Sequence, residues 1–116
     1  MKIKKDIVVV GSVAFDDVKT VKGDHKRLLG GSGTYFSIAS SLYTKVHLVG
    51  VVGDDFDETY INMLNSKLIS TKFLSRQKGE TFHWGGVYSD DFSTRKTLFT
   101  KLGAVSYTHL RAHETV

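Results

Sequence analysis

The stretch Gly30-Gly31-Ser32-Gly33-Thr34-Tyr35-Phe36-Ser37-Ile38-Ala39 joins a glycine-rich turn to a segment with helical periodicity. Three glycines within four residues permit close backbone approach and positive φ. In the segment that follows, apolar residues recur at helical spacing, at Tyr35, Ile38, Ala39 and Leu42. A glycine turn that opens a helix can offer backbone N–H groups to a polar ligand, or it can only let the helix pack closely. Both interpretations stay open from this stretch alone.

The composition is that of one small globular domain: 116 residues, 41% of them hydrophobic and 24% charged. No apolar run approaches the roughly 20 residues that span a bilayer, and the N-terminus lacks a signal-peptide pattern. Cysteine is absent, which excludes disulfides, thiolate metal sites and cysteine nucleophiles. The net charge of +4 comes with scattered lysines rather than a basic stripe. We therefore expect no nucleic-acid partner, no membrane partner and a cytoplasmic location.

The first half of the chain reads as strand, excursion, helix, strand. Residues 7–10 and 46–52 are β-branched runs typical of strands buried on both faces of a parallel sheet. Residues 13–21 predict an antiparallel strand that turns at Gly23-Asp24 and pairs with residues 26–29. Together with a helix over residues 34–43, these segments predict a parallel βαβ unit.

The acidic segment 53–58 predicts the start of a second helix. Asp54 can serve as its N-cap, and the carboxylates that follow suit the positive end of the helix dipole. The expected inward face consists of Phe56, Tyr60, Met63, Leu64 and Lys67. A metal site would also use clustered carboxylates, but helix-start chemistry explains them more simply, so we expect no metal. Residues 71–74 predict a short third strand.

Beyond Gly79 the pattern changes to a hairpin. Residues 81–88 and 94–100 read as two strands joined by the turn-rich loop 89–93. We expect a small antiparallel sheet that stands apart from the parallel one, and the strand near residues 15–22 can join it. The hairpin aromatics Phe82, Trp84 and Tyr88 are expected to pack against the core or a partner subunit.

Residues 104–116 continue neither periodicity. They resemble a peptide that recurs where a cloning or sequencing adapter has been translated, so we expect a non-native tail. His109 and His113 have the i, i+4 spacing of a helical metal pair, but a metal site would need a third ligand.

Asp16 is the carboxylate closest to the end of the first strand, in Gly11-Ser12-Val13-Ala14-Phe15-Asp16. Ligands of open α/β sheets collect at the carboxyl ends of the strands. A carboxylate at this edge, facing a glycine loop, can accept hydrogen bonds from vicinal hydroxyls. The neighbouring Asp17 is expected to point to the opposite face of the strand, as a surface residue.

Several motifs together resemble the PfkB (ribokinase-like) family of carbohydrate and nucleoside kinases. They are residues 8–12 with Asp16, the glycine loop 30–33, residues 49–56, residues 79–82 and residues 90–95. The resemblance covers nearly all of residues 5–103, with the motifs in the family's order.

This resemblance implies an α/β fold: residues 1–103 as the N-terminal part of a Rossmann-like parallel sheet with helices, plus a β lid. The lid strands would be about 15–29 and 80–100. It implies a phosphotransferase that uses ATP and Mg²⁺, takes a small-molecule sugar or nucleoside and can form a homodimer through the lid. The implied substrate-binding residues are Asp16, Gly30, Gly31, Ser32, Gly33 and Tyr35. Tyr35 stands where the family commonly has asparagine, and Ala14 where ribokinases proper tend to have it.

The family's catalytic aspartate lies in a downstream Gly-Ala-Gly-Asp motif, which this sequence does not contain. The chain also lacks a phosphate-binding loop of the form G-x-x-x-x-G-K-[ST]. We therefore expect an inactive N-terminal fragment with neither a catalytic residue nor a cofactor site. Two alternatives are a nucleotide-binding oxidoreductase domain, although no G-x-G-x-x-G follows the first strand, and a non-enzymatic interaction module that uses the lid.

Overall fold

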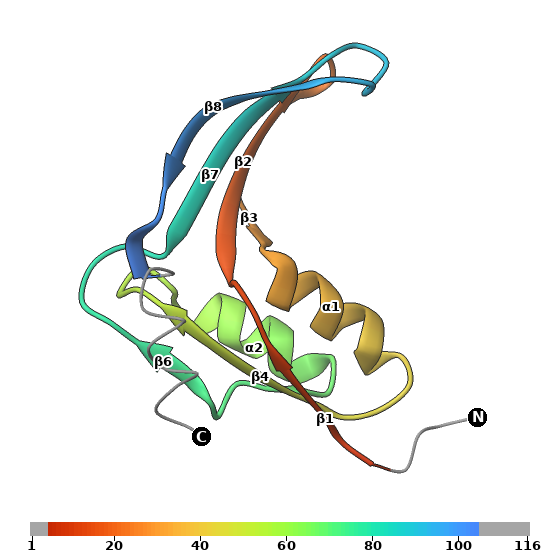
Figure 1. Ribbon diagram of the computed structural model, residues 1–116, viewed down its shortest axis with the longest axis vertical. Coiled ribbons are helices and arrows are strands. Elements are labelled where there is room, and N and C mark those ends of the chain that lie inside the picture. The colour runs from red at the N-terminus through yellow and green to blue at the C-terminus, as the bar shows by residue number, and fades with distance from the viewer. Residues whose placement is uncertain (1–4, 105–116) are drawn as a thin grey trace.

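The computed structural model describes residues 5–104, which form a parallel sheet with two helices and a second, mixed sheet (Figure 1). The tail from residue 105 on, with His109 and His113, lies outside the described residues. Ala104 is buried, and its N–H donates to the carbonyl oxygen of Glu80 (2.8 Å). The boundary between residues 103 and 104 stays a prediction.

The parallel sheet confirms the predicted βαβ unit. Strand β1 (Ile7–Val10) leads through the second sheet to helix α1 (Ser32–Ser41), and β4 (Val46–Val52) then pairs parallel with β1. Helix α2 (Glu58–Ser66) follows, and two short strands, β5 (Ile69–Ser70) and β6 (Leu74–Arg76), pair with different parts of β4. The prediction of one strand over residues 71–74 was wrong, because a turn there separates two shorter strands.

The second sheet, which we call the lid, rises as an arm from one end of the parallel sheet (Figure 1). It consists of β2 (Ala14–Thr20), β3 (Gly23–Gly30), β7 (Phe82–Tyr88) and β8 (Arg95–Lys101), in the order β3-β2-β7-β8. The hairpin β7–β8 is confirmed. The lid is not wholly antiparallel, because β2 pairs parallel with β7. The turn between β2 and β3 lies at residues 21–22, two positions before the predicted Gly23-Asp24.

The core joins the base of the lid to the parallel sheet. Phe15 of β2 is fully buried and stacks on Phe56, with ring centroids 5.8 Å apart, and it also contacts Tyr60 of α2. Leu48 of β4 and Leu64 of α2 belong to the same hydrophobic cluster. The lid is therefore anchored by a buried aromatic side chain, which fixes where β2 leaves the core.

Helix α1 presents mainly small residues to the sheet, so the predicted apolar face was wrong except at Ile38, which packs against the core. Gly33, Thr34 and Ser37 are buried, whereas Tyr35 is 57% exposed and Leu42 is 76% exposed. The helix approaches β1 so closely that a Cβ on Gly33 would lie 2.8 Å from the carbonyl carbon of Gly11. Such packing requires small side chains, which hydrophobic periodicity does not register.

Helix α2 begins later than predicted. Its N-cap is Asp57, whose Oδ1 accepts a hydrogen bond from the N–H of Thr59 (3.0 Å). Asp54 instead accepts from the N–H of Gly79 (3.1 Å). Leu64 and Phe56 are buried as expected, while Met63 is more than a third exposed. No helix among residues 5–104 has the length and apolar character to cross a membrane.

One face of the parallel sheet is uncovered in the described part of the chain. Val8 and Val10 of β1 are 64% and 55% exposed, and Phe73 beside β6 is 53% exposed. Uncovered apolar faces and unpaired edge strands promote association. We expect the isolated chain to self-associate as its concentration rises, as size-exclusion chromatography over a range of protein concentrations would measure. A monodisperse monomer at every concentration would contradict this expectation.

Candidate functional site

Asp16, Gly30 and Tyr35 meet where the lid joins the parallel sheet. The phenol of Tyr35 donates a hydrogen bond to Oδ2 of Asp16 (3.3 Å). Gly30 ends β3 directly beneath this pair: a Cβ on Gly30 would overlap Oδ2 of Asp16 and lie 3.1 Å from the Tyr35 hydroxyl. Three of the six predicted substrate-binding residues therefore form one cluster, and the absence of a side chain on Gly30 makes room for it.

The Asp16 carboxyl is half-buried, and this changes its acidity. Burial raises the pKa of Asp16 above its ordinary value, while the Tyr35 hydrogen bond and the nearby His83 oppose the rise. Burial and the neighbouring Asp16 charge likewise raise the pKa of the Tyr35 phenol. A desolvated carboxylate with few partners in the chain is a strong acceptor for ligand hydroxyls.

The glycine loop packs against the end of β1. The N–H of Ser32 donates to Oγ of Ser12 (3.0 Å), and the N–H of Gly33 donates to the Ser12 carbonyl (2.8 Å). Gly31 has a φ of 93°, and a Cβ there would overlap the Ser12 carbonyl oxygen. Two N–H groups at the start of α1 are thus occupied within the chain. This geometry favours the close-packing interpretation of the loop over a backbone anion cradle.

Trp84 is a site neighbour that the sequence analysis missed. The parallel pairing of β2 with β7 places it directly opposite Asp16, on the same face of the lid. Its indole N–H donates to Oγ1 of Thr97 (3.2 Å), and the Arg95 guanidinium lies 5.2 Å from its ring centroid. The sequence placed both strands in one lid, but it carried no signal that these two would pair directly and in parallel.

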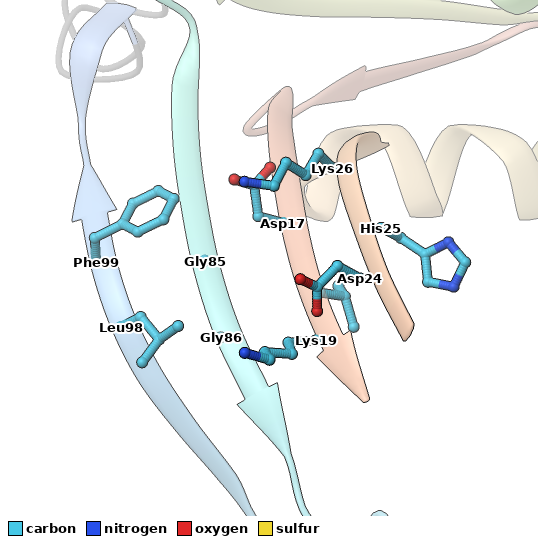
Figure 2. Close-up of a pocket in the computed structure, with 10 residues that line it drawn as sticks. Asp17, Lys19, Asp24, His25, Lys26, Gly85, Gly86, Leu98 and Phe99 are labelled. Carbon is cyan, nitrogen blue, oxygen red and sulfur yellow. The ribbon is translucent and has the colours of Figure 1, made fainter. Parts of the chain in front are cut away.

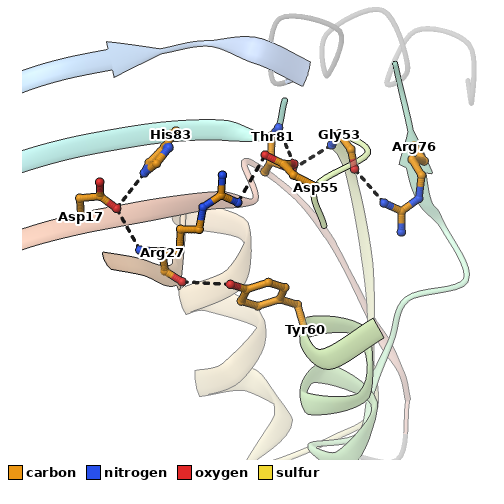
Figure 3. A network of polar contacts seen from close by, with 8 residues as sticks. All are labelled: Asp17, Arg27, Gly53, Asp55, Tyr60, Arg76, Thr81 and His83. Atoms are coloured by element: carbon orange, nitrogen blue, oxygen red, sulfur yellow. Dashed lines mark hydrogen bonds and ion pairs between the residues drawn. The ribbon is translucent and has the colours of Figure 1, made fainter. Parts of the chain in front are cut away.

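Asp17 is part of a polar network at the base of the lid, not a plain surface residue (Figure 3). At a bulge between β2 and β3, Arg27 has a φ of 53°, and its N–H donates to Oδ1 of Asp17 (2.9 Å). The same oxygen lies 2.8 Å from Nε2 of His83. The Arg27 carbonyl accepts from the Tyr60 hydroxyl of α2 (3.3 Å), so the network ties the lid to the core.

We expect Asp16 and Asp17 to affect stability in opposite directions. Burial opposes ionisation of Asp17, but the Arg27 N–H and His83 hold the pKa of Asp17 below its ordinary 3.8. The stability that this carboxylate contributes is present above pH 3.8 and is lost as the pH falls through the lower, folded pKa. For Asp16 the pKa is raised, so its contribution is greatest below pH 3.8 and is lost as the pH rises through the folded pKa.

Asp17→Asn should therefore lower the free energy of unfolding at pH 7 by about 1–2 kcal/mol, since it loses charge-assisted bonds. Asp16→Asn should leave it unchanged or raise it. Urea unfolding between pH 3 and pH 7, at low protein concentration, would measure both. A destabilised Asp16→Asn variant beside an unaffected Asp17→Asn variant would contradict this assignment.

A second cluster fixes the segment that enters β7 (Figure 3). Oδ1 of Asp55 accepts from both the N–H and the hydroxyl of Thr81 (2.9 and 2.6 Å). The buried Thr81 hydroxyl in turn accepts from the N–H of Gly53 (2.9 Å), and Arg76 donates to the Gly53 carbonyl (2.8 Å). Asp55, one of the carboxylates predicted to start α2, therefore holds the segment that enters lid strand β7.

The lid also has a hollow of about 220 Å³, lined by Asp17, Lys19, Asp24, Lys26, Gly85, Leu98 and Phe99 among others (Figure 2). Its lining does not include Asp16, Gly30 or Tyr35. Phe99 lies over Gly85, where a Cβ would overlap the ring. This hollow and the Asp16 cluster are separate features of the lid.

Solved structures of small-molecule kinases share this fold. A Burkholderia thailandensis nucleoside kinase in complex with inosine superposes with a TM-score of 0.77 and 17% identity, over 91% of this chain and 38% of that one. A Cryptococcus neoformans ribokinase in complex with ADP gives a TM-score of 0.69, with 24% identity over 87% and 35% of the two chains. A Halothermothrix orenii fructokinase gives 0.66, with 21% identity over 89% and 40%.

The chain has a ribokinase-like fold. The expected fold class is thereby confirmed, with the lid pairing corrected as described above. The chain spans 35–40% of the length of these three kinases. No family model and no curated protein matches it. The ribokinase-like fold places Asp16 at the junction of lid and parallel sheet; the substrate-binding roles of Asp16, Gly30, Gly31, Ser32, Gly33 and Tyr35 stay predictions.

Proposed function

We propose that residues 1–103 form the N-terminal, substrate-binding portion of an ATP-dependent kinase that phosphorylates a hydroxyl group of a sugar or nucleoside. We call the complete protein the parent kinase. The observation that carries this proposal is the half-buried Asp16 carboxylate beside Gly30 and Tyr35 at the base of the lid. The ribokinase-like fold supports it, since the solved neighbours include nucleoside kinase, ribokinase and fructokinase structures.

In this proposal Asp16 binds the acceptor rather than activating it. An ionised carboxylate accepts hydrogen bonds from ligand hydroxyls, and partial burial strengthens those bonds because water competes less. The lid covers the acceptor and excludes water from it. We also propose that the lid forms contacts in a homodimer of the parent kinase. The proposed location of the parent kinase is the cytoplasm.

ATP and Mg²⁺ would be bound by parts of the parent kinase other than this chain. No three His, Asp or Glu side chains gather into a possible metal site within residues 5–104. The sequence has neither the Gly-Ala-Gly-Asp motif nor a Walker-type loop. The residues present do not fit the nucleotide, so no phosphoryl-transfer step is assigned to them.

The 116-residue chain is accordingly expected to show no ATP-dependent phosphorylation of sugars or nucleosides. Phosphoryl transfer requires that both substrates be positioned and that the developing charge be stabilised, and this chain contributes only the acceptor side. An ADP-release assay over a panel of sugars and nucleosides would measure it. Turnover clearly above the blank would contradict the proposal that this chain binds only the acceptor and that the nucleotide binds elsewhere in the parent kinase.

The two alternatives fare differently. The residues after β1 lead into lid strand β2 instead of a helix, which disfavours a dinucleotide-binding oxidoreductase domain. An interaction module retains one supporting observation, since Val21, Leu28 and Leu98 of the lid are 61%, 45% and 57% exposed. In the parent kinase the same side chains would be available for lid-to-lid contacts.

A further inference from the structure

Tyr35 bonds to one oxygen of the Asp16 carboxylate, the group that binds the ligand hydroxyls in the proposed function. Its hydroxyl donates to Oδ2 of Asp16 (3.3 Å), and the same oxygen packs so closely against Gly30 that a Cβ there would overlap it. A carboxylate has two oxygens that can accept from hydroxyl donors. Because Oδ2 contacts both Tyr35 and Gly30, Oδ1 is the oxygen left for a ligand.

The Tyr35 side chain does not pack in the hydrophobic core. It is 57% exposed and lies outside the hydrophobic cluster, so rotating it away exposes little additional apolar surface. Among the described residues, the Tyr35 side chain forms one hydrogen bond, to Asp16. A phenol is itself a hydroxyl donor, so it competes directly with a ligand hydroxyl for the same lone pairs.

This competition should affect the binding of vicinal diols more than the binding of ligands with a single hydroxyl. A vicinal diol that bonds to both carboxylate oxygens must first displace the phenol, and it gains one net bond by doing so. A ligand that presents one hydroxyl binds Oδ1 and leaves Tyr35 in place. Tyr35 therefore weakens the binding of vicinal diols but not the binding of ligands with a single hydroxyl.

We propose that Tyr35 is a specificity-determining residue that makes Asp16 a one-hydroxyl acceptor, so that the site no longer prefers a vicinal diol over a ligand with a single hydroxyl at that position. This inference rests on the proposed function and narrows its substrate class. Removing the phenol oxygen restores the second acceptor and with it a preference for diols.

The test compares Tyr35→Phe with the unchanged 116-residue chain. The probe pairs are inosine with 2′-deoxyinosine, and D-ribose with 2-deoxy-D-ribose. Each is titrated at low protein concentration and followed by the fluorescence of the single tryptophan, Trp84, which lies opposite Asp16. Tyr35→Phe should bind the diol of a pair about three- to tenfold more tightly, as expected when a competing hydrogen bond to a charged group is removed. The deoxy partner should change by less than about twofold.

Tyr43→Phe is the matched control, because Tyr43 is a similarly exposed tyrosine (58%) just beyond the same helix. It should leave both affinities unchanged. The ¹³Cζ resonance of Tyr35 should also shift in Asp16→Asn, which reports the contact without any ligand. An unchanged diol-to-deoxy ratio in Tyr35→Phe would overturn the inference and leave the proposed function standing. If neither chain binds either pair, the proposed function fails, and the inference fails with it.

Discussion

Replacing Asp16 with alanine is expected to lower kcat/KM of the parent kinase by about 100-fold. The change removes a charge-assisted hydrogen bond, worth roughly 1.5–3 kcal/mol, and leaves a ligand hydroxyl unpaired under the lid, which adds to the loss. Asp16→Asn retains the shape and one acceptor, so its effect should be intermediate. Steady-state kinetics over a sugar and nucleoside panel would measure both, with the KM for ATP nearly unchanged because the nucleotide binds elsewhere.

The control for this experiment is Asp24, an exposed aspartate on β3. Asp24→Ala should change kcat/KM by less than about threefold. Asp17 is unsuitable as a control, since its carboxylate bonds to Arg27 and His83 at the base of the lid. If Asp16→Ala retained full activity, Asp16 would not be the acceptor-binding group.

Gly53→Ala is expected to lower the free energy of unfolding by about 3 kcal/mol or more, a large part of the 5–15 kcal/mol typical of a small domain. Gly53 is buried, and a Cβ there would overlap backbone atoms of Gly79, Glu80 and Thr81. Backbone atoms cannot rotate aside as a side chain can, so the segment that enters β7 must shift. That shift would also break the bond from the Gly53 N–H to the Thr81 hydroxyl.

Urea unfolding, followed by Trp84 fluorescence, would measure this loss, and Gly79→Ala is the matched comparison. Gly79 has a φ of 111° but nothing within 4 Å of an added Cβ, so its alanine variant carries backbone strain alone. We expect that strain to cost about 1–3 kcal/mol, less than the Gly53 overlap. An equal loss of unfolding free energy in the two variants would show that the close backbone contacts at Gly53 do not restrict the residue at this position.

Local sequence patterns predicted many of the strands and helices of this fold. The β-branched run at residues 7–10 and its counterpart at 46–52 have the composition of doubly buried strands, and they do pair in parallel. The hairpin of residues 81–100 was marked by its turn-rich loop. Asp16 and the glycine loop were singled out because each stands at the end of an element, where ligands collect in α/β sheets.

The sequence by itself thus determined which segments become strands and helices, because hydrophobic period and turn chemistry act over a few neighbouring residues. Only the tertiary structure decided that β2 pairs parallel with β7, which sets Trp84 opposite Asp16. It also decided that Asp55 holds Thr81 rather than starting a helix, and that the exposed Tyr35 reaches Asp16. These contacts join residues far apart in the chain, and their register depends on how both sheets pack around the core, which no local pattern records.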